Sequence, residues 1–400
     1  MAVTEVTDIK NPDWMERLGS SFKGILFGLL LFVLGFPLLF WNEGRAVKTA
    51  RRLSEGAGAV ASVPADAIEP ANEGRLVHVS GMASVDGAIA DDAFGVSARA
   101  IRLDRQVEIF QWVEHAETRV EREGDAEKKI TTYTYSREWC DAPVDSSRFK
   151  EEGHENSTTP AFGHAQWLAP AVKLGAFSLS PSNIRRIGGA RPFALPQDYA
   201  LPGALVDAGA QVVGNAVLVP VAPPPQAAPS TNGAPAAGAA PRSVAATPEI
   251  GDLRVTFRVI DPHEISLVGK QAGNRFEPWT GKDGKSLSLQ CDGIADAATM
   301  FAAAQSAGKN VAWLLRLAGF LLMFVGLRMV FRPLAVLVDV IPVVRALVSG
   351  GVALAAFVLA LACALVTISI AWIAYRPLLA IPLLVVAVAL VVFAFRRKRA

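Results

Sequence analysis

The sequence predicts a multi-pass α-helical membrane protein with four spans and a large, β-rich α+β extracytoplasmic domain between spans one and two. Two observations lead to this fold class. Almost purely apolar residues fill the runs 24–41, 311–331, 352–374 and 378–395, and a helix needs about 20 such residues to cross the hydrocarbon core. By contrast, the long stretch 42–310 is rich in charged and turn residues and carries strand-like alternation.

The first run decides how the chain enters the membrane. It is longer than the apolar part of a cleaved signal peptide, and no small-x-small site directly follows Trp41, so we expect a retained signal anchor. The basic end 396–400 favours a cytoplasmic C terminus. With four spans, the tail 1–23 is then cytoplasmic and the domain 42–310 is not. Local charge at span one opposes this orientation, because four basic residues follow it: Arg45, Lys48, Arg51 and Arg52.

A few polar and small residues pattern the spans. Arg316 and Arg328 lie near the two ends of span two, where long side chains can reach the headgroups. Arg376 lies in the turn before span four. Glycines seven residues apart share one helix face in each of the first two spans, which permits close helix approach. Ordinary glycine frequency in membrane helices explains this pattern equally well; the residues are Gly28, Gly35, Gly319 and Gly326.

The segment 332–349 is apolar but interrupted by Asp339, Pro342 and Arg345. It is too short to cross the bilayer comfortably, so we expect an interfacial or re-entrant segment on the cytoplasmic side. Asp339 and Arg345 are six residues apart, which does not suit pairing along one helix. We therefore expect Asp339 to pair with an arginine across a bend or on another helix.

Within the domain, most signals are those of strands. Residues 101–119 and 130–139 flank Glu123-Gly124-Asp125 and predict a long hairpin. A helix is expected within 161–174. The Pro/Ala-rich insertion 221–247 has almost no large apolar residues, and we interpret it as disordered. Other expected elements are strands at 76–79, 253–260, 265–268, 276–279 and 287–290, a turn at Asp283-Gly284, and a helix over 295–309 that leads into span two.

The sequence predicts no catalytic, cofactor-binding or metal-binding residue. It has no phosphate-binding glycine loop, nucleophile elbow, His-Glu-x-x-His or Cys-x-x-Cys pattern. His154 and His164 lie near acidic residues, but a solvated loop explains them better than a metal site. The acid pairs Asp91-Asp92 and Glu151-Glu152 lack a matching base, and we assign both to the surface. A net charge of +2 gives no support for binding nucleic acid.

Three cysteines leave one question open. Cys140 and Cys291 both lie in the domain and can form a disulfide in an oxidising compartment, whereas two free thiols are the simpler alternative. Cys363 lies in span three, where we expect a packing role. Asn156-Ser157-Thr158 is a glycosylation sequon, relevant only to a luminal domain in a eukaryotic cell.

Motifs along the whole chain resemble the transmembrane protein 43 (LUMA) family. The most specific one is Trp41-Asn42-Glu43-Gly44-Arg45, which ends span one. Others are 24–28, 36–40, 46–49, 72–78, 111–114, 251–255, 337–339, 342–343, Trp372 and 375–378. The Pro/Ala insertion departs from the family. The resemblance implies four spans, both termini in the cytoplasm, one large luminal-side domain and no established enzymatic activity.

For function, the resemblance implies a membrane scaffold that self-associates and organises membrane protein complexes. In eukaryotic relatives it implies the endoplasmic reticulum, the inner nuclear membrane and lamina-associated partners. The Ala-rich composition is typical of a bacterial protein, for which the inner (cell) membrane is expected. Expected partners are the lipid bilayer, a second copy of the chain and other membrane proteins, with no cofactor. The alternatives are an accessory subunit of a transporter or channel and, less favoured, a membrane-bound enzyme.

Overall fold

The computed structural model describes residues 2–6, 14–123, 126–156, 160–221, 244–336 and 342–377. The chain forms two compact units. The β-rich unit comprises Met1–Asn11, Ser62–Glu277 and Gln290–Asp296. The helical unit comprises Pro12–Ala61, Pro278–Leu289 and Ala297–Ala400.

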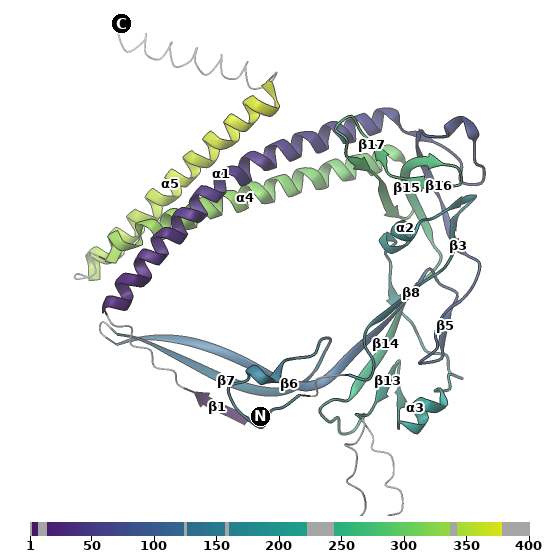
Figure 1. Cartoon of the computed structure of the whole chain (residues 1–400), viewed down its shortest axis with the longest axis horizontal. Coiled ribbons are helices and arrows are strands. Elements are labelled where there is room, and N and C mark those ends of the chain that lie inside the picture. Colours follow the sequence, from purple (N-terminus) through teal and green to yellow (C-terminus); the bar gives the residue numbers. More distant parts are fainter. Residues whose placement is uncertain are drawn as a thin grey trace, which may run out of the picture. The chain divides into compact units, whose positions relative to one another are not determined.

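Three long helices dominate the described part of the helical unit, namely α1 (Trp14–Ala59), α4 (Ala297–Val336) and α5 (Pro342–Tyr375) (Figure 1). Each includes a stretch long and apolar enough to cross a membrane, within Gly24–Ala59, Ala297–Phe331 and Gly351–Tyr375. These stretches confirm the first three apolar runs as candidate membrane helices. The fourth expected span, 378–395, and the side chains of Asp339 and Arg345 lie outside what the structure describes.

Helix α1 continues well past the end of its apolar run. Residues 46–59 include several good helix formers, Ala, Lys, Arg, Leu and Glu, and extend the helix to Ala59. The expected helix over 295–309 forms the first turns of α4. A hairpin of β17 (Trp279–Thr280) and β18 (Ser286–Leu287) lies beside these extensions, where Asp283 pairs with Arg52 at 3.8 Å. Its expected turn is present, with Gly284 at φ 72°.

Two larger sheets make up most of the β-rich unit, which confirms a β-rich region between the first and second candidate spans. The first has eight strands in the order β1-β7-β6-β14-β13-β12, with β11 beside β14 and β8 beside β6. Their bounds are β1 (Ala2–Val6), β6 (Arg102–Glu123), β7 (Ala126–Cys140), β8 (Ala165–Leu168), β11 (Arg191–Pro192), β12 (Gln211–Val213), β13 (Ala216–Val219) and β14 (Leu253–Ile260).

The second sheet has seven strands, and five of them, β3, β15, β16, β10 and β9, pair in a closed ring. The bounds are β2 (Ala61–Ser62), β3 (Leu76–Val85), β9 (Val172–Leu174), β10 (Phe177–Ser178), β15 (Glu264–Ala272), β16 (Arg275–Glu277) and β19 (Leu289–Asp292). The remaining elements are β4 (Ile89–Asp91), β5 (Val96–Ala98), the short helices α2 (Pro181–Arg186) and α3 (Gly203–Asp207), and the 3₁₀ turns Pro70–Asn72 and Ser146–Arg148.

Strand alternation supplies the core of this unit. On β14 the side chains of Leu253, Val255, Phe257 and Val259 are buried, because alternate residues of a strand face the same side. The ring of Phe257 packs against Phe94 at 5.8 Å between centroids. The expected strands at 76–79, 253–260 and 265–268 are therefore confirmed.

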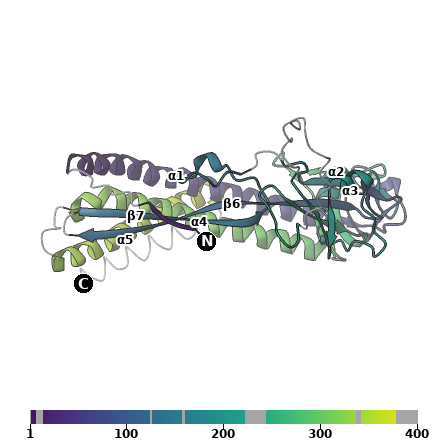
Figure 2. The same cartoon turned by 90° about the horizontal axis from the view of Figure 1, so that it is seen from below.

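The long hairpin predicted from the sequence is β6–β7 (Figure 2). Its register runs without a break from Ile109↔Cys140 to Glu123↔Ala126. At about 3.3 Å per residue, the 22 residues of β6 span about 70 Å. Only the first part of β6 pairs with β14, from Arg102↔Ile260 to Ile109↔Leu253.

Two expectations for this unit are wrong. Residues 161–174 form β8 and β9 instead of a helix, because β8 gains ladder hydrogen bonds along β6 and Pro170 separates the two strands. Asp91 is not a surface acid: it is 1% exposed, and its carboxylate pairs with the Arg105 guanidinium at 2.8 Å. A buried carboxylate needs such a partner, and sequence spacing does not reveal it.

Strand β1 pairs antiparallel with β7, from Ala2↔Tyr135 to Val6↔Thr131. These two segments are expected on opposite faces of the bilayer, because one span lies between them. This pairing requires residues 2–6 to lie on the same side as β7, which is incompatible with a single crossing between them.

Candidate functional site

The candidate site begins with a close antiparallel contact between α1 and α4. A Cβ built at Gly28 would lie 2.7 Å from the Gly326 carbonyl oxygen, and one at Gly35 would lie 3.1 Å from the Gly319 carbonyl oxygen. Such distances leave no room for a side chain at this contact. The close approach that the glycine spacing permits is therefore confirmed.

The seven-residue spacing on α1 continues to Asn42, where the contact between the helices becomes polar. Asn42 is fully buried, and its Nδ2 donates to the carbonyl oxygen of Ala312 on α4 at 3.0 Å. Its Oδ1 accepts a hydrogen bond from Arg45 at 3.3 Å. The side chain thus caps the glycine contact with a specific bond that fixes the axial position of the two helices.

Glu43 joins three helices through one carboxylate. It is 0% exposed, and its two oxygens accept from Nε and Nη2 of Arg316 on α4, at 2.6 and 2.9 Å. The indole Nε1 of Trp372 on α5 donates to Oε2 at 2.9 Å. A bidentate, charge-assisted pair is among the stronger hydrogen-bonded contacts, and a low dielectric strengthens it.

This arrangement is suited to holding helices together. Both carboxylate oxygens already accept donors, and Arg316 also lies over the ring of Trp313, with 4.8 Å from Cζ to the centroid. Removing either charge would leave the other buried without compensation, which is strongly unfavourable. We call Glu43, Arg316 and Trp372 the helix lock.

Exposed aromatic side chains mark the level of the helix lock in the bilayer. Trp41 and Trp313 are 57% and 67% exposed. Tryptophans of this kind concentrate at the membrane–water interface. The lock therefore lies near one edge of the hydrocarbon core instead of its centre.

The rest of the 41–45 motif packs against the end of α5. A Cβ at Gly44 would lie 2.6 Å from the ring of Tyr375, so only glycine leaves room for that ring. Phe40 contacts the same ring at 5.3 Å between centroids. Arg51, two turns further along α1, donates to the Tyr375 carbonyl oxygen at 3.0 Å.

The structure brings together only some of the residues singled out from the sequence. Arg316 does not reach toward headgroups as expected, because Glu43 holds it. Arg328 is exposed near the end of α4, and Arg376 is half-buried just after α5. Sequence patterns single out Glu43 and Arg316 separately and predict no contact for Trp372. One signal could have revealed the pair: Glu43 and Arg316 lie at the same depth of the membrane, each at the end of an apolar run.

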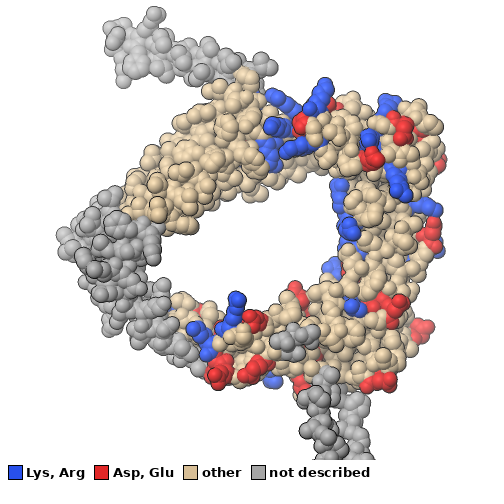
Figure 3. All heavy atoms as spheres, viewed as in Figure 1, with Lys and Arg blue, Asp and Glu red and all other residues tan. Residues whose placement is uncertain are grey.

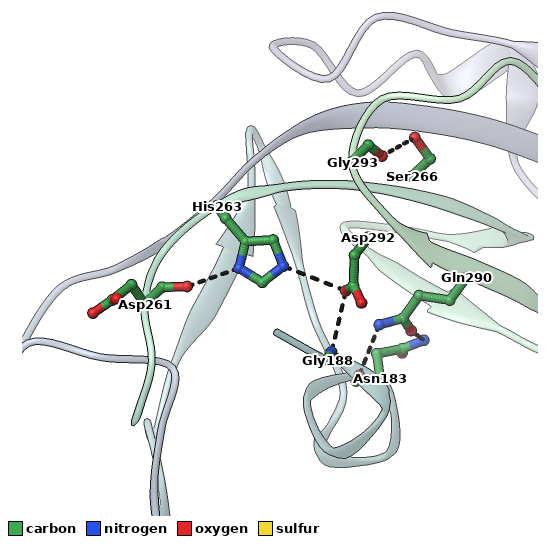
Figure 4. Close-up of polar contacts among 8 residues, drawn as sticks. All are labelled: Asn183, Gly188, Asp261, His263, Ser266, Gln290, Asp292 and Gly293. Carbon is green, nitrogen blue, oxygen red and sulfur yellow. Dashed lines mark hydrogen bonds and ion pairs between the residues drawn. The ribbon is translucent and has the colours of Figure 1, made fainter. Parts of the chain in front are cut away.

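In the β-rich unit, His263 and His164 form hydrogen bonds with backbone groups and a neighbouring side chain. His263 lies between the Asp261 carbonyl oxygen, at 2.8 Å, and the Asp292 carboxylate, at 3.3 Å, while Asp292 also accepts from the Gly188 N–H (Figure 4). Both ring nitrogens of His164 contact backbone groups, Val107 N–H and Asp141 C=O. Among the described residues, no group of three or more His, Cys, Asp or Glu side chains could hold a metal ion.

A second buried polar group lies on the hairpin. Tyr135 is 2% exposed and donates to the Glu114 carboxylate at 2.7 Å, and His154 stacks on its ring at 4.1 Å between centroids. Burial, followed by the hydrogen bond to Glu114, raises the pKa of Tyr135 to about 12. The phenol therefore stays protonated at physiological pH and serves as a hydrogen-bond donor in the packing of the hairpin.

The cysteines are free thiols in the structure, which decides the open question on Cys140 and Cys291 in favour of two thiols. Burial raises the pKa of the Cys291 thiol, which makes it less reactive. Cys363 is partly buried and packs in the apolar cluster of the helical unit, as expected.

The described fold and the helix lock define an integral membrane protein with several candidate spans and a large β-rich insertion. Comparisons with known proteins agree. The family model described as transmembrane protein 43 matches residues 109–377. Curated proteins named transmembrane protein 43 match from Pongo abelii, 34% identical over 97% of this chain and 93% of that protein, and from Homo sapiens, 33% identical over 99% and 94%. A homologue from Drosophila melanogaster is 30% identical over 92% and 93%.

The chain belongs to the transmembrane protein 43 family. No solved structure matches it. The family resemblance indicated by the 41–45 motif and the other motifs along the chain is therefore confirmed.

Proposed function

We propose that the chain is a non-catalytic integral membrane scaffold that associates with itself and organises other membrane proteins. The helical unit supports an anchoring role, since its three described helices contain long apolar stretches and the buried Glu43 is paired with Arg316. We further propose a cell-membrane location for a bacterial protein, and the endoplasmic reticulum or inner nuclear membrane for a eukaryotic one.

The observation that carries the proposal is an open strand edge on the β6–β7 hairpin. Beyond Trp112, whose backbone bonds the Asn156 side chain, no described strand pairs with the edge of β6 that faces away from β7. The backbone groups of Glu114, Ala116 and Thr118 point to this edge, because alternate residues of a strand share a hydrogen-bonding direction. Such an edge is a template for adding a strand from another chain. We propose that the strand comes from a second copy.

Blocking this edge is expected to weaken self-association. Ala116→Pro removes an N–H that points away from β7, so the hairpin keeps its own ladder. In a two-fold pair both copies lose one bond, about 1 kcal/mol each, which predicts dimerisation weaker by about 30-fold. Crosslinking in native membranes, followed by identification of the crosslinked chains, measures this.

Ala116→Thr is the matched control, because it keeps the N–H and favours strands. The variant should crosslink like the unmodified chain. Unchanged dimerisation of Ala116→Pro would reject the edge as the contact, and absence of any crosslinked partner would reject the scaffold.

We also propose that the 42–310 domain lies outside the cytoplasm, on the side opposite the C terminus. Single cysteines placed at Thr4, Lys282 and Ala400 in a cysteine-free chain test this with a membrane-impermeant maleimide on sealed cells. Labelling of Lys282→Cys alone is expected. Labelling of Thr4→Cys together with Lys282→Cys would instead support the β1–β7 pairing, and labelling of Ala400→Cys alone would invert the proposed orientation.

An accessory subunit of a transporter or channel is the alternative, because Glu43 is a buried acid at membrane level and such residues often mark ion pathways. The hydrogen bonds of that carboxylate argue against this alternative, because Arg316 and Trp372 already donate to its oxygens. A Glu43-dependent proton or ion flux in vesicles would favour the alternative.

A further inference from the structure

A stripe of basic residues follows the interfacial Trp41 along α1. Arg45, Lys48 and Arg52 lie four, seven and eleven residues beyond Trp41, a spacing that puts all four on one helix face. Figure 3 shows Lys and Arg side chains gathered on the helical unit next to the uncharged surface of α5. This stripe is the basic flank that opposed the expected topology.

Within the described residues, most of this positive charge has no carboxylate partner. Arg52 pairs with Asp283 at 3.8 Å, and the nearby Glu43 pairs with Arg316. Arg45 contacts only neutral groups, the Asn42 side chain at 3.3 Å and the Trp41 ring, and its buried Nε has no hydrogen-bond partner. Lys48 is exposed. The charge is thus available to an external anion.

The level of the stripe indicates which anion it meets. Trp41 is largely exposed and marks the interface. Lys48 lies seven residues further along α1, about 10 Å at 1.5 Å per residue, and its flexible side chain can reach back toward the bilayer. Phospholipid phosphates occupy this layer, between the hydrocarbon core and water.

We propose that Arg45 and Lys48 bind the headgroup of an anionic phospholipid, with Trp41 against its glycerol and upper acyl region. The bound lipid offsets a cluster of positive charge that otherwise opposes the proposed orientation of the chain. The site is independent of the proposed self-association, since its residues lie on α1 and not on the hairpin.

Native mass spectrometry of the full-length protein in a neutral detergent tests this site. Dioleoyl phosphatidylglycerol, dioleoyl phosphatidylcholine and inorganic phosphate are titrated separately. The anionic lipid is expected to bind most tightly. The double variant Arg45→Gln/Lys48→Gln should weaken its binding by about 30-fold, equivalent to about 1 kcal/mol for each basic residue removed.

The double variant Lys282→Gln/Lys285→Gln is the matched control, since it removes two exposed positive charges elsewhere in the helical unit. Its affinity should stay within about twofold of the unmodified chain. If the Arg45 change disturbs folding, Lys48→Gln alone, at an exposed position, should still weaken binding by about fivefold. Equal affinity for the two lipids, equal binding of free phosphate, or equal loss in the control would overturn the proposal.

Discussion

Glu43→Ala is expected to lower the free energy of unfolding of the helical unit by about 3–5 kcal/mol. The substitution leaves the Arg316 guanidinium without its bidentate acceptor and the Trp372 indole N–H without its bond. Arg316 is only 18% exposed, so water replaces the lost contacts poorly. Denaturation of the purified chain in mixed micelles with increasing SDS, followed by far-UV circular dichroism, measures the loss.

Two further variants separate the cost of leaving one charge unpaired from the net contribution of the ion pair to stability. Glu43→Leu/Arg316→Met removes both charges and should recover most of the stability, because an apolar replacement of a buried pair is often neutral or better. Glu55→Ala removes a partly exposed carboxylate further along α1 that accepts the Lys282 N–H, and should cost less than about 1 kcal/mol. If the Glu43→Ala chain were as stable as the unmodified one, the helix lock would not stabilise the helical unit.

Gly326→Ala is expected to separate α1 from α4. Its Cβ would lie 2.5 Å from the Gly28 carbonyl oxygen and 2.6 Å from the Phe32 nitrogen. Both are backbone atoms, which cannot rotate away, so the helices must shift along the whole contact. The cost of such overpacking is about 1–3 kcal/mol. The same SDS titration measures this cost.

Gly24→Ala provides the control for that substitution. Gly24 lies on α1, the other helix of the contact, and a Cβ there would meet nothing within 4 Å. Alanine also favours helix over glycine, so this variant should be as stable as the unmodified chain or slightly more stable. If Gly326→Ala and Gly24→Ala had the same stability, the glycine spacing would reflect only the ordinary frequency of glycine in membrane helices.

Several features of the molecule could be predicted because they depend on local patterns. The apolar runs gave the three described candidate spans, and alternation together with Glu123-Gly124-Asp125 gave the β6–β7 hairpin. Such patterns report whether a segment is apolar, helical or extended, and each is complete within about 20 residues. The prediction failed at 161–174, where β8 pairs with β6 and β9 pairs with β3, contacts that the local pattern does not report.

The sequence alone determined that this protein crosses a membrane, has a β-rich insertion and belongs with the transmembrane protein 43 family. The binding of Glu43 to Arg316 and Trp372, which are 273 and 329 residues away along the chain, depends on the folded arrangement of the helices. A buried charge must find a partner, but its own neighbourhood in sequence does not say which one. That choice follows from the antiparallel contact of α1 and α4, which sets acid and base at the same depth.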